Sequence, residues 1–238
     1  MYRNIVVLRW VVVGSKFERA RTPEAKRSRE NAILAAAARL ATRDGVREVT
    51  LTAIADEIGM HKSALLRYFE TREQIYLQLA ATGYEEWSTD ARNRLAAFSA
   101  RPVDADPSRA IATVLARTLI ERPLFCDLLA HIPLNLERNV SLDAVRAFKI
   151  RAIADTAAVA AAISVIAPLR QDQALNVVVT ATVMAGALWQ MAAPGTHLRD
   201  FYESDPDLAH AVVDVEPRIV DIVSALLDGY ANERSPAG

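Results

Sequence analysis

Residues 61–67 carry side chains that can bind a polyanion. Two of them are cationic and two offer hydrogen-bonding groups, within one short stretch that has helical spacing: His61, Lys62, Ser63 and Arg67. Leu65 and Phe69 are four residues apart, so in a helix they share an inward face and leave the cations on the other side. Such a face can touch base edges and phosphates in a DNA groove. A basic helix face is usually only a solvated surface, so further signals are needed.

Catalysis is the rival class of function, and the sequence argues against it. The four histidines are scattered, and the chain has no HExxH or paired ExxH motif, no glycine-rich phosphate loop and no nucleophile elbow. Asp207 and His210 are three residues apart, a spacing that is most often a surface feature. We therefore expect no enzymatic activity, no catalytic residue, no metal site and no cofactor.

Local capping signals divide the N-terminal part of the chain into helices. Thr22, Thr50 and Thr71 are suitable N-caps, and Gly45 and Gly59 are suitable stops. Two short helices joined by a glycine turn are typical of a helix-turn-helix. The helices expected in this part cover residues 23–44, 51–58, 62–69 and 72–97.

The residues at these positions resemble the N-terminal signature of the TetR family of transcriptional regulators. That pattern has an alanine-rich first helix, a glycine, a short helix with Ile-Ala, a glycine turn, an aromatic–Phe pair and a basic residue opening the fourth helix. The resemblance covers about 50 residues, and several spacings match at once. The matching residues are Ile33–Ala37, Gly45, Leu51–Ala55, Ile58–Met60, Tyr68–Phe69 and Arg72–Glu73.

The resemblance implies a ligand-responsive regulator, most commonly a repressor, that binds a palindromic double-stranded DNA operator as a homodimer. Carried onto this chain, it places DNA contacts on the second helix, the third helix and the start of the fourth. With His61 from the basic stretch, the expected contact residues are Thr50, Thr52, His61, Lys62, Ser63, Arg67, Tyr68 and Arg72. Tyr68 can equally be a core residue beside Phe69.

Two positions depart from the family pattern. His61 stands where a small hydroxyl residue is common, and this weakens the expected cap of the third helix. Leu66 stands where a phosphate-binding tyrosine is common, so a hydrogen bond is lost or replaced by an apolar contact. Both keep open an alternative, namely a helical interaction protein of the same fold that has lost operator binding.

Apolar residues recur at three- and four-residue spacing throughout the chain, which predicts an all-α protein. We expect an N-terminal three-helix helix-turn-helix domain over residues 22–72 and a helical ligand-binding and dimerisation domain over 73–238. Pro217 should separate a short helix over 206–213 from the final helix. The helices expected there cover residues 107–121, 124–131, 141–165, 171–192, 206–213 and 215–229.

In the family the last two helices form a four-helix dimer interface, and here they correspond to residues 171–192 and 215–229. The first contains small residues that would allow close helix approach, and the second an apolar stripe. Both patterns are equally compatible with a monomer core. The residues are Ala174, Ala181, Ala185 and Gly186, and Ile219, Ile222, Val223, Leu226 and Leu227.

The effector site cannot be assigned from the resemblance, because the family diverges after residue 80. Many apolar residues and few buried charges favour an apolar or aromatic effector. Trp87, Phe125 and Phe148 are candidates for its lining, although aromatic residues at helical spacing are more often core.

Charge and cysteine content agree with a DNA-binding protein of the cytoplasm. Residues 1–80 carry 14 Lys and Arg against 9 Asp and Glu, while residues 81–238 carry 14 against 20. A polyanion would therefore bind the N-terminal part. The single cysteine, Cys126, allows no internal disulfide or cysteine-cluster metal site, favours a reducing compartment, and is expected in the core.

Residues 1–21 contain the apolar run 5–13, which could be read as a signal peptide. Arg9 interrupts the run, no clean cleavage site follows, and the run is too short to cross a bilayer. We expect a disordered extension and no membrane segment.

Overall fold

The computed structural model describes residues 22–99 and 106–233, so the extension expected over residues 1–21 lies outside the described part. Every regular element in the described part is helical, which confirms the predicted all-α class. The α-helices are α1 (Pro23–Asp44), α2 (Leu51–Glu57), α3 (Lys62–Leu65), α4 (Arg72–Ser99), α5 (Pro107–Ile120), α6 (Pro123–His131), α7 (Leu142–Ile166), α8 (Gln171–Ala192), α9 (His197–Ser204) and α10 (Val215–Asn232).

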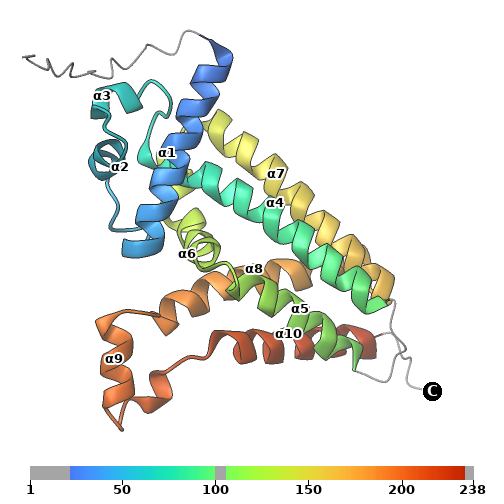
Figure 1. Ribbon diagram of the computed structural model, residues 1–238. Coiled ribbons are helices and arrows are strands. Elements are labelled where there is room, and N and C mark those ends of the chain that lie inside the picture. The colour runs from blue at the N-terminus through green and yellow to red at the C-terminus, as the bar shows by residue number, and fades with distance from the viewer. Residues whose placement is uncertain (1–21, 100–105, 234–238) are drawn as a thin grey trace, which may run out of the picture.

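We call residues 22–72 the head. Its helices begin where the capping signals predict: the hydroxyl of Thr22 accepts from the Ala25 N–H at 3.2 Å, and that of Thr50 from the Ala53 N–H at 3.1 Å. The helix-turn-helix lies beside α1 in Figure 1. The third helix is shorter than predicted, because it ends at Leu65 and a turn replaces its last residues. The buried side chains of the head come from all three of its helices and include Ile33, Leu40, Ile54, Leu65 and Phe69.

We call residues 73–233 the body. The long helix α4 enters it from the head and packs along α7, while α5 packs along α10 and α8 lies against α6, α7 and α10 (Figure 1). A π-helical turn, Ile132–Leu136, and a 3-10 turn, Glu137–Asn139, connect α6 to α7. Short helical connections of this kind let α6 lie against both the head helix α1 and the body.

The segment between α8 and α10 differs from the prediction. A helix over 206–213 was expected, but only the 3-10 turn Ala209–Ala211 forms there, and the helix of this segment is α9, over 197–204. Ala193 adopts a left-handed conformation with φ 41°, which ends α8, and Thr196 caps α9 by accepting from the Arg199 N–H at 3.3 Å. Pro217 lies inside the first turn of α10, where its missing N–H costs nothing.

The small residues of α8 serve the protomer itself. Ala174, Ala181, Ala185 and Gly186 are all buried in the fold, and a Cβ on Gly186 would stand 2.7 Å from the Ala130 nitrogen of α6. At Gly186 the predicted close approach is therefore to α6 of the same chain.

Among the described helices, only α8 is long and apolar enough to cross a membrane by length and composition. Of its most apolar stretch, 44% is buried, where α8 packs against α5, α6, α7 and α10.

Candidate nucleic-acid interface

The helix-turn-helix presents most of the predicted contact residues to solvent. Gly59 forms the turn with φ 62°, a conformation that favours glycine. After this turn Leu65 and Phe69 face the core, and the cations of α3 remain outside. The exposed predicted residues are Thr50, Thr52, His61, Lys62, Ser63 and Arg67. The structure thus brings six of the eight together on the two helices of the motif and their turn.

The two departures from the family pattern have visible consequences. His61 is the N-cap residue of α3 but makes no capping side-chain hydrogen bond, which confirms the expected weakness of this cap. Its Nδ1 instead lies 3.2 Å from the Ser63 hydroxyl. Leu66 is 45% exposed, so an apolar side chain lies on the outer face of the reading helix. Tyr68 is half-buried and packs against the core, so its ring can belong to the core while its exposed part remains available for a DNA contact.

Several exposed cations on and beside the helix-turn-helix have no ion-pair partner among the described residues. Lys62 and Arg67 are exposed and have no ion-pair partner among the residues described. The same holds for Arg47 in the loop before α2, which sequence reasoning missed because no helix periodicity marks it. By contrast, Arg39 is paired with Glu57 at 3.2 Å. Three cations are therefore free to meet phosphates.

Arg72 holds the loop between α1 and α2. Its Nη1 donates to the carbonyl oxygens of Val46, Arg47 and Val49 at 3.2, 3.2 and 2.8 Å, and its Nε to Glu73 at 3.1 Å. The guanidinium also lies 5.3 Å from the ring centre of Tyr76, a cation–π distance. Arg72 supports the head from the start of α4. A phosphate contact through its remaining nitrogen, Nη2, stays a prediction.

The three aromatic candidates for an effector site belong to one cluster around Tyr84. The ring centres of Trp87, Phe125 and Phe148 lie 6.4, 5.0 and 6.1 Å from that of Tyr84. Trp87 is fully buried and its Nε1 donates to the Thr118 hydroxyl at 3.0 Å, which makes it a core residue. Phe125 and Phe148 are also buried, but each borders a separate cavity, of about 340 and 280 Å³ respectively.

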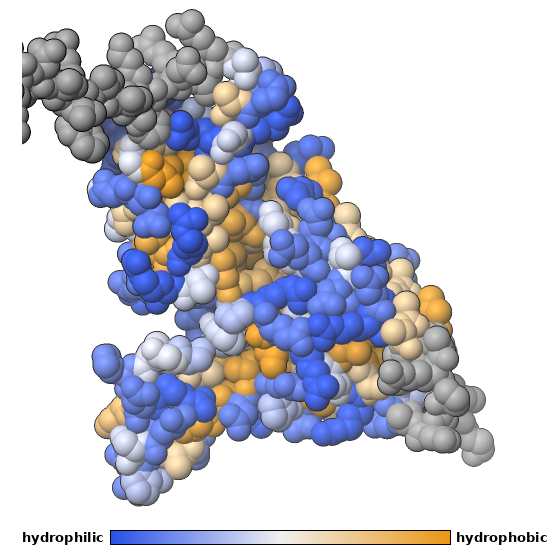
Figure 2. All heavy atoms as spheres, in the orientation of Figure 1, coloured by the Kyte–Doolittle hydropathy of each residue, from blue (hydrophilic) through white to orange (hydrophobic). Residues whose placement is uncertain are grey.

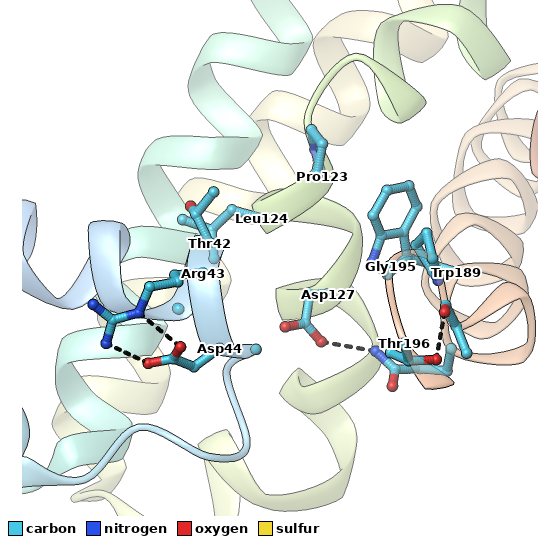
Figure 3. A pocket seen from close by; sticks show the side chains of 14 residues that line it. Thr42, Arg43, Asp44, Pro123, Leu124, Asp127, Trp189, Gly195 and Thr196 are labelled. Atoms are coloured by element: carbon cyan, nitrogen blue, oxygen red, sulfur yellow. Dashed lines mark hydrogen bonds and ion pairs between the residues drawn. The ribbon is translucent and has the colours of Figure 1, made fainter. Parts of the chain in front are cut away.

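Head and body meet at Asp127 of α6, beside a cleft of about 320 Å³ (Figure 3). Its Oδ2 accepts from the Val46 N–H at 2.8 Å and its Oδ1 from Gln190 Nε2 at 2.7 Å, with His131 Nε2 3.4 Å away. Burial would raise the pKa of this carboxyl, but the hydrogen bonds from His131, Val46 and Gln190 outweigh it and hold the pKa below its ordinary value. Asp127 therefore stays ionised and links α6, α8 and the head loop.

Cys126, next to Asp127, is buried as expected. Among the residues described, no group of three or more His, Cys, Asp or Glu side chains is placed to hold a metal ion.

A head of this geometry on a helical body defines a DNA-binding transcriptional regulator. The chain belongs to the TetR family of these regulators. A family model described as Tetracyclin repressor-like, C-terminal domain, matches residues 81–234, and one described as Bacterial regulatory proteins, tetR family, matches residues 33–79. No curated protein sequence matches the chain significantly.

A solved structure agrees on the fold. The chain is similar to a possible TetR family regulator from Streptomyces coelicolor A3(2), with a TM-score of 0.55 and 15% identity over 86% of this chain and 100% of that one. It is also similar to Thermus thermophilus FadR, a TetR family repressor in complex with lauroyl-CoA, with a TM-score of 0.49 and 19% identity over 88% and 98% of the two chains. A third similar structure is a TetR/AcrR family regulator from Thermobifida fusca YX-ER1, with a TM-score of 0.48 and 20% identity over 85% of this chain and 98% of that one.

Proposed function

We propose that this regulator is a ligand-responsive repressor that binds a palindromic operator as a homodimer. The observation that carries the proposal is the exposed face of α3 and of the turn that follows it, where Lys62 and Arg67 project without ion-pair partners in the described part of the chain. Cations held on the second helix of a helix-turn-helix are placed to enter the major groove.

The proposed contacts divide by chemistry. Lys62, Arg67 and Arg47 would neutralise phosphates and supply most of the affinity. The hydroxyl of Thr50 already caps α2, yet its hydrogen stays free to donate to a phosphate oxygen. The remaining predicted residues would touch base edges or the backbone beside them: Thr52, His61, Ser63, Tyr68 and Arg72.

Dimerisation would use α8 and α10, which pack side by side. On α8, Val179, Val183 and Met191 are 47, 61 and 59% exposed, and on α10 Ile222 and Leu226 are half-buried. Two copies facing each other through this surface would form a four-helix interface with twofold symmetry. Their heads would then read half-sites about 34–36 Å apart if one helical turn separates them.

Repression would follow from occupation of the operator, which blocks access to the promoter. An apolar or aromatic effector bound in the body would change the spacing of the heads and lower DNA affinity. The coupling free energy required is of the usual allosteric size, about 1–3 kcal/mol.

The K62A/R67A double variant tests the proposal. We expect specific binding to the DNA that flanks the protein's own gene to weaken, and the slope of log affinity against log salt to fall by about 2, because two phosphate contacts are lost. The R109A/R117A variant is a matched control, since it removes two charges from α5 whose ion pairs to α10 are exposed. If both variants bind like the wild type, α3 is not the reading helix.

The second candidate is an interaction protein of the same fold that has lost operator binding. The uncapped start of α3 at His61 and the exposed Leu66 favour it. Under this alternative the wild type binds all DNA equally weakly, and neither Lys62 nor Arg67 affects sequence preference.

A further inference from the structure

A cleft of about 340 Å³ lies where the head meets the body, bounded by α1, α4 and α6. Ala38 and Thr42 of α1 form the head wall, while α4 contributes Leu79 and α6 contributes Leu124 and Leu128. In Figure 2, apolar side chains are exposed in the middle of the face, over the region where these helices come together. This volume lies at the lower end of small-molecule pockets and is too small for a partner helix.

The floor of the cleft is built for close packing. A Cβ on Gly83 would stand 2.4 Å from the ring of Phe125, so only glycine lets this ring pack so closely against α4. The ring also packs against Tyr84 in a T-shaped arrangement, with 5.0 Å between centres. The apolar floor is therefore fixed before any ligand arrives, which lowers the cost of binding.

Charge at the rim selects the ligand. Arg122 is already neutralised, because its Nη2 donates to Asp90 at 3.0 Å and its Nη1 to the Thr118 carbonyl at 2.7 Å. Glu86 is exposed at the rim and has no ion-pair partner among the described residues. The unbalanced charge is therefore negative, which disfavours anionic ligands such as carboxylates.

Hydrogen bonds join head and body, and one of them involves Asp127, which lies on α6 between the cleft residues Leu124 and Leu128. The Asp127 carboxylate accepts from the Val46 N–H, and the Glu70 carboxylate accepts from the Ser141 N–H, both at 2.8 Å. The first of these bonds joins α6 to the loop that follows α1. A molecule inserted between α1 and α6 would therefore strain the hydrogen bond between Val46 and Asp127 and shift the head relative to the body.

We propose that this junction cleft, which shares only Phe125 with the aromatic cluster, is the effector site, and that it binds a small apolar molecule without negative charge. The inference rests on the proposed ligand response and gives that response a place and a ligand class. Occupation would separate α1 from α6 and lower DNA affinity by about 5- to 150-fold, the usual allosteric range.

The test uses two fluorophores with one skeleton. N-phenyl-1-naphthylamine is uncharged, and 1-anilinonaphthalene-8-sulfonate is the same molecule with a sulfonate. We expect the uncharged probe to bind the full chain saturably, once per protomer and more tightly than the sulfonate. Glu86→Gln should narrow the difference between them. Equal binding of both probes to the wild type would overturn the proposed charge selection.

Filling the cleft provides the decisive comparison. Ala38→Leu and Thr82→Leu add volume from two walls, whereas Ala35→Leu adds the same volume on the exposed side of α1. We expect probe binding to be at least tenfold weaker in Ala38→Leu and Thr82→Leu. In the Ala35→Leu control, probe binding should equal that of the wild type. Unchanged binding in a folded Ala38→Leu or Thr82→Leu variant overturns the proposal. Binding that appears only after residues 1–21 are deleted also overturns it, because the chain itself would then occupy the cleft.

The proposed coupling between the cleft and DNA binding is tested separately, by measuring DNA affinity with and without the probe. The uncharged probe should weaken DNA binding by the wild type but not by Ala38→Leu, and no effect on the wild type overturns the coupling. Probe binding is measured without DNA, and DNA binding is judged by the Lys62 and Arg67 variants, so failure of one proposal is distinguishable from failure of the other.

Discussion

Replacing Arg72 with alanine should destabilise the head, because one guanidinium holds the whole loop between α1 and α2. A single nitrogen has two hydrogens, so one hydrogen is shared between two of the three carbonyl contacts at 2.8–3.2 Å, and the three together are worth about two full hydrogen bonds. A hydrogen bond to a charged group contributes about 1.5–3 kcal/mol, and the contact with Tyr76 about 0.5–1 kcal/mol. Water can replace part of this after truncation. We expect the free energy of unfolding to fall by about 2–4 kcal/mol.

Urea denaturation at one fixed protomer concentration measures this loss, since the stability of a dimer depends on concentration. Arg43→Ala is the matched control: Arg43 is an exposed head arginine paired only with its neighbour Asp44, and its removal should leave the free energy of unfolding almost unchanged. Arg72→Lys should recover less than half of the loss, because lysine lacks the planar fork. Equal stability of the Arg72 and Arg43 alanine variants would refute the supporting role. A drop of about 1 in the salt slope at unchanged stability would show a phosphate contact instead.

Three further predictions test the fold and the dimer. Gly83→Ala should lower the free energy of unfolding by about 1–3 kcal/mol, because the added Cβ meets the packed ring of Phe125. Gly229→Ala should raise it by about 0.4–1 kcal/mol, because position 229 faces open space in a helix. Thermal or urea unfolding compares the two variants. Val183→Glu should convert the dimer to monomer in sedimentation experiments, and Val165→Glu, 77% exposed on α7, should not; dissociation by both or by neither contradicts the proposed interface. Burial and a nearby carboxylate raise the pKa of the Cys126 thiol to about 12, so at pH 8 a thiol-reactive dye should label it only after unfolding, and rapid labelling of the native protein would contradict this.

The head could be predicted closely because its signals are local. Thr22 and Thr50 cap their helices within three residues, and Gly59 supplies a backbone conformation that other residues avoid. Such signals act within one turn of chain and need no knowledge of the fold. The same holds for the weak cap at His61, which the residue type alone foretold.

The body could be predicted less well, because its features depend on distant neighbours. The buried small residues of α8 indicate close packing without naming the partner, and Gly186 turned out to face α6. Ala193 ends α8 in a left-handed conformation that no glycine announces, so α9 was placed too late in the chain. Arg72 and Arg47 illustrate the same limit, since only the folded loop shows which cation is held and which is free.

Selection of binding sites from random double-stranded DNA by the purified full-length protein tests the central claim most directly. The account predicts enrichment of an inverted repeat whose half-sites lie one or more helical turns apart, because two α3 helices would read it from a symmetric dimer. The K62A/R67A variant should enrich no such repeat. Enrichment of no sequence by the wild type, or of a single half-site without symmetry, would contradict the account.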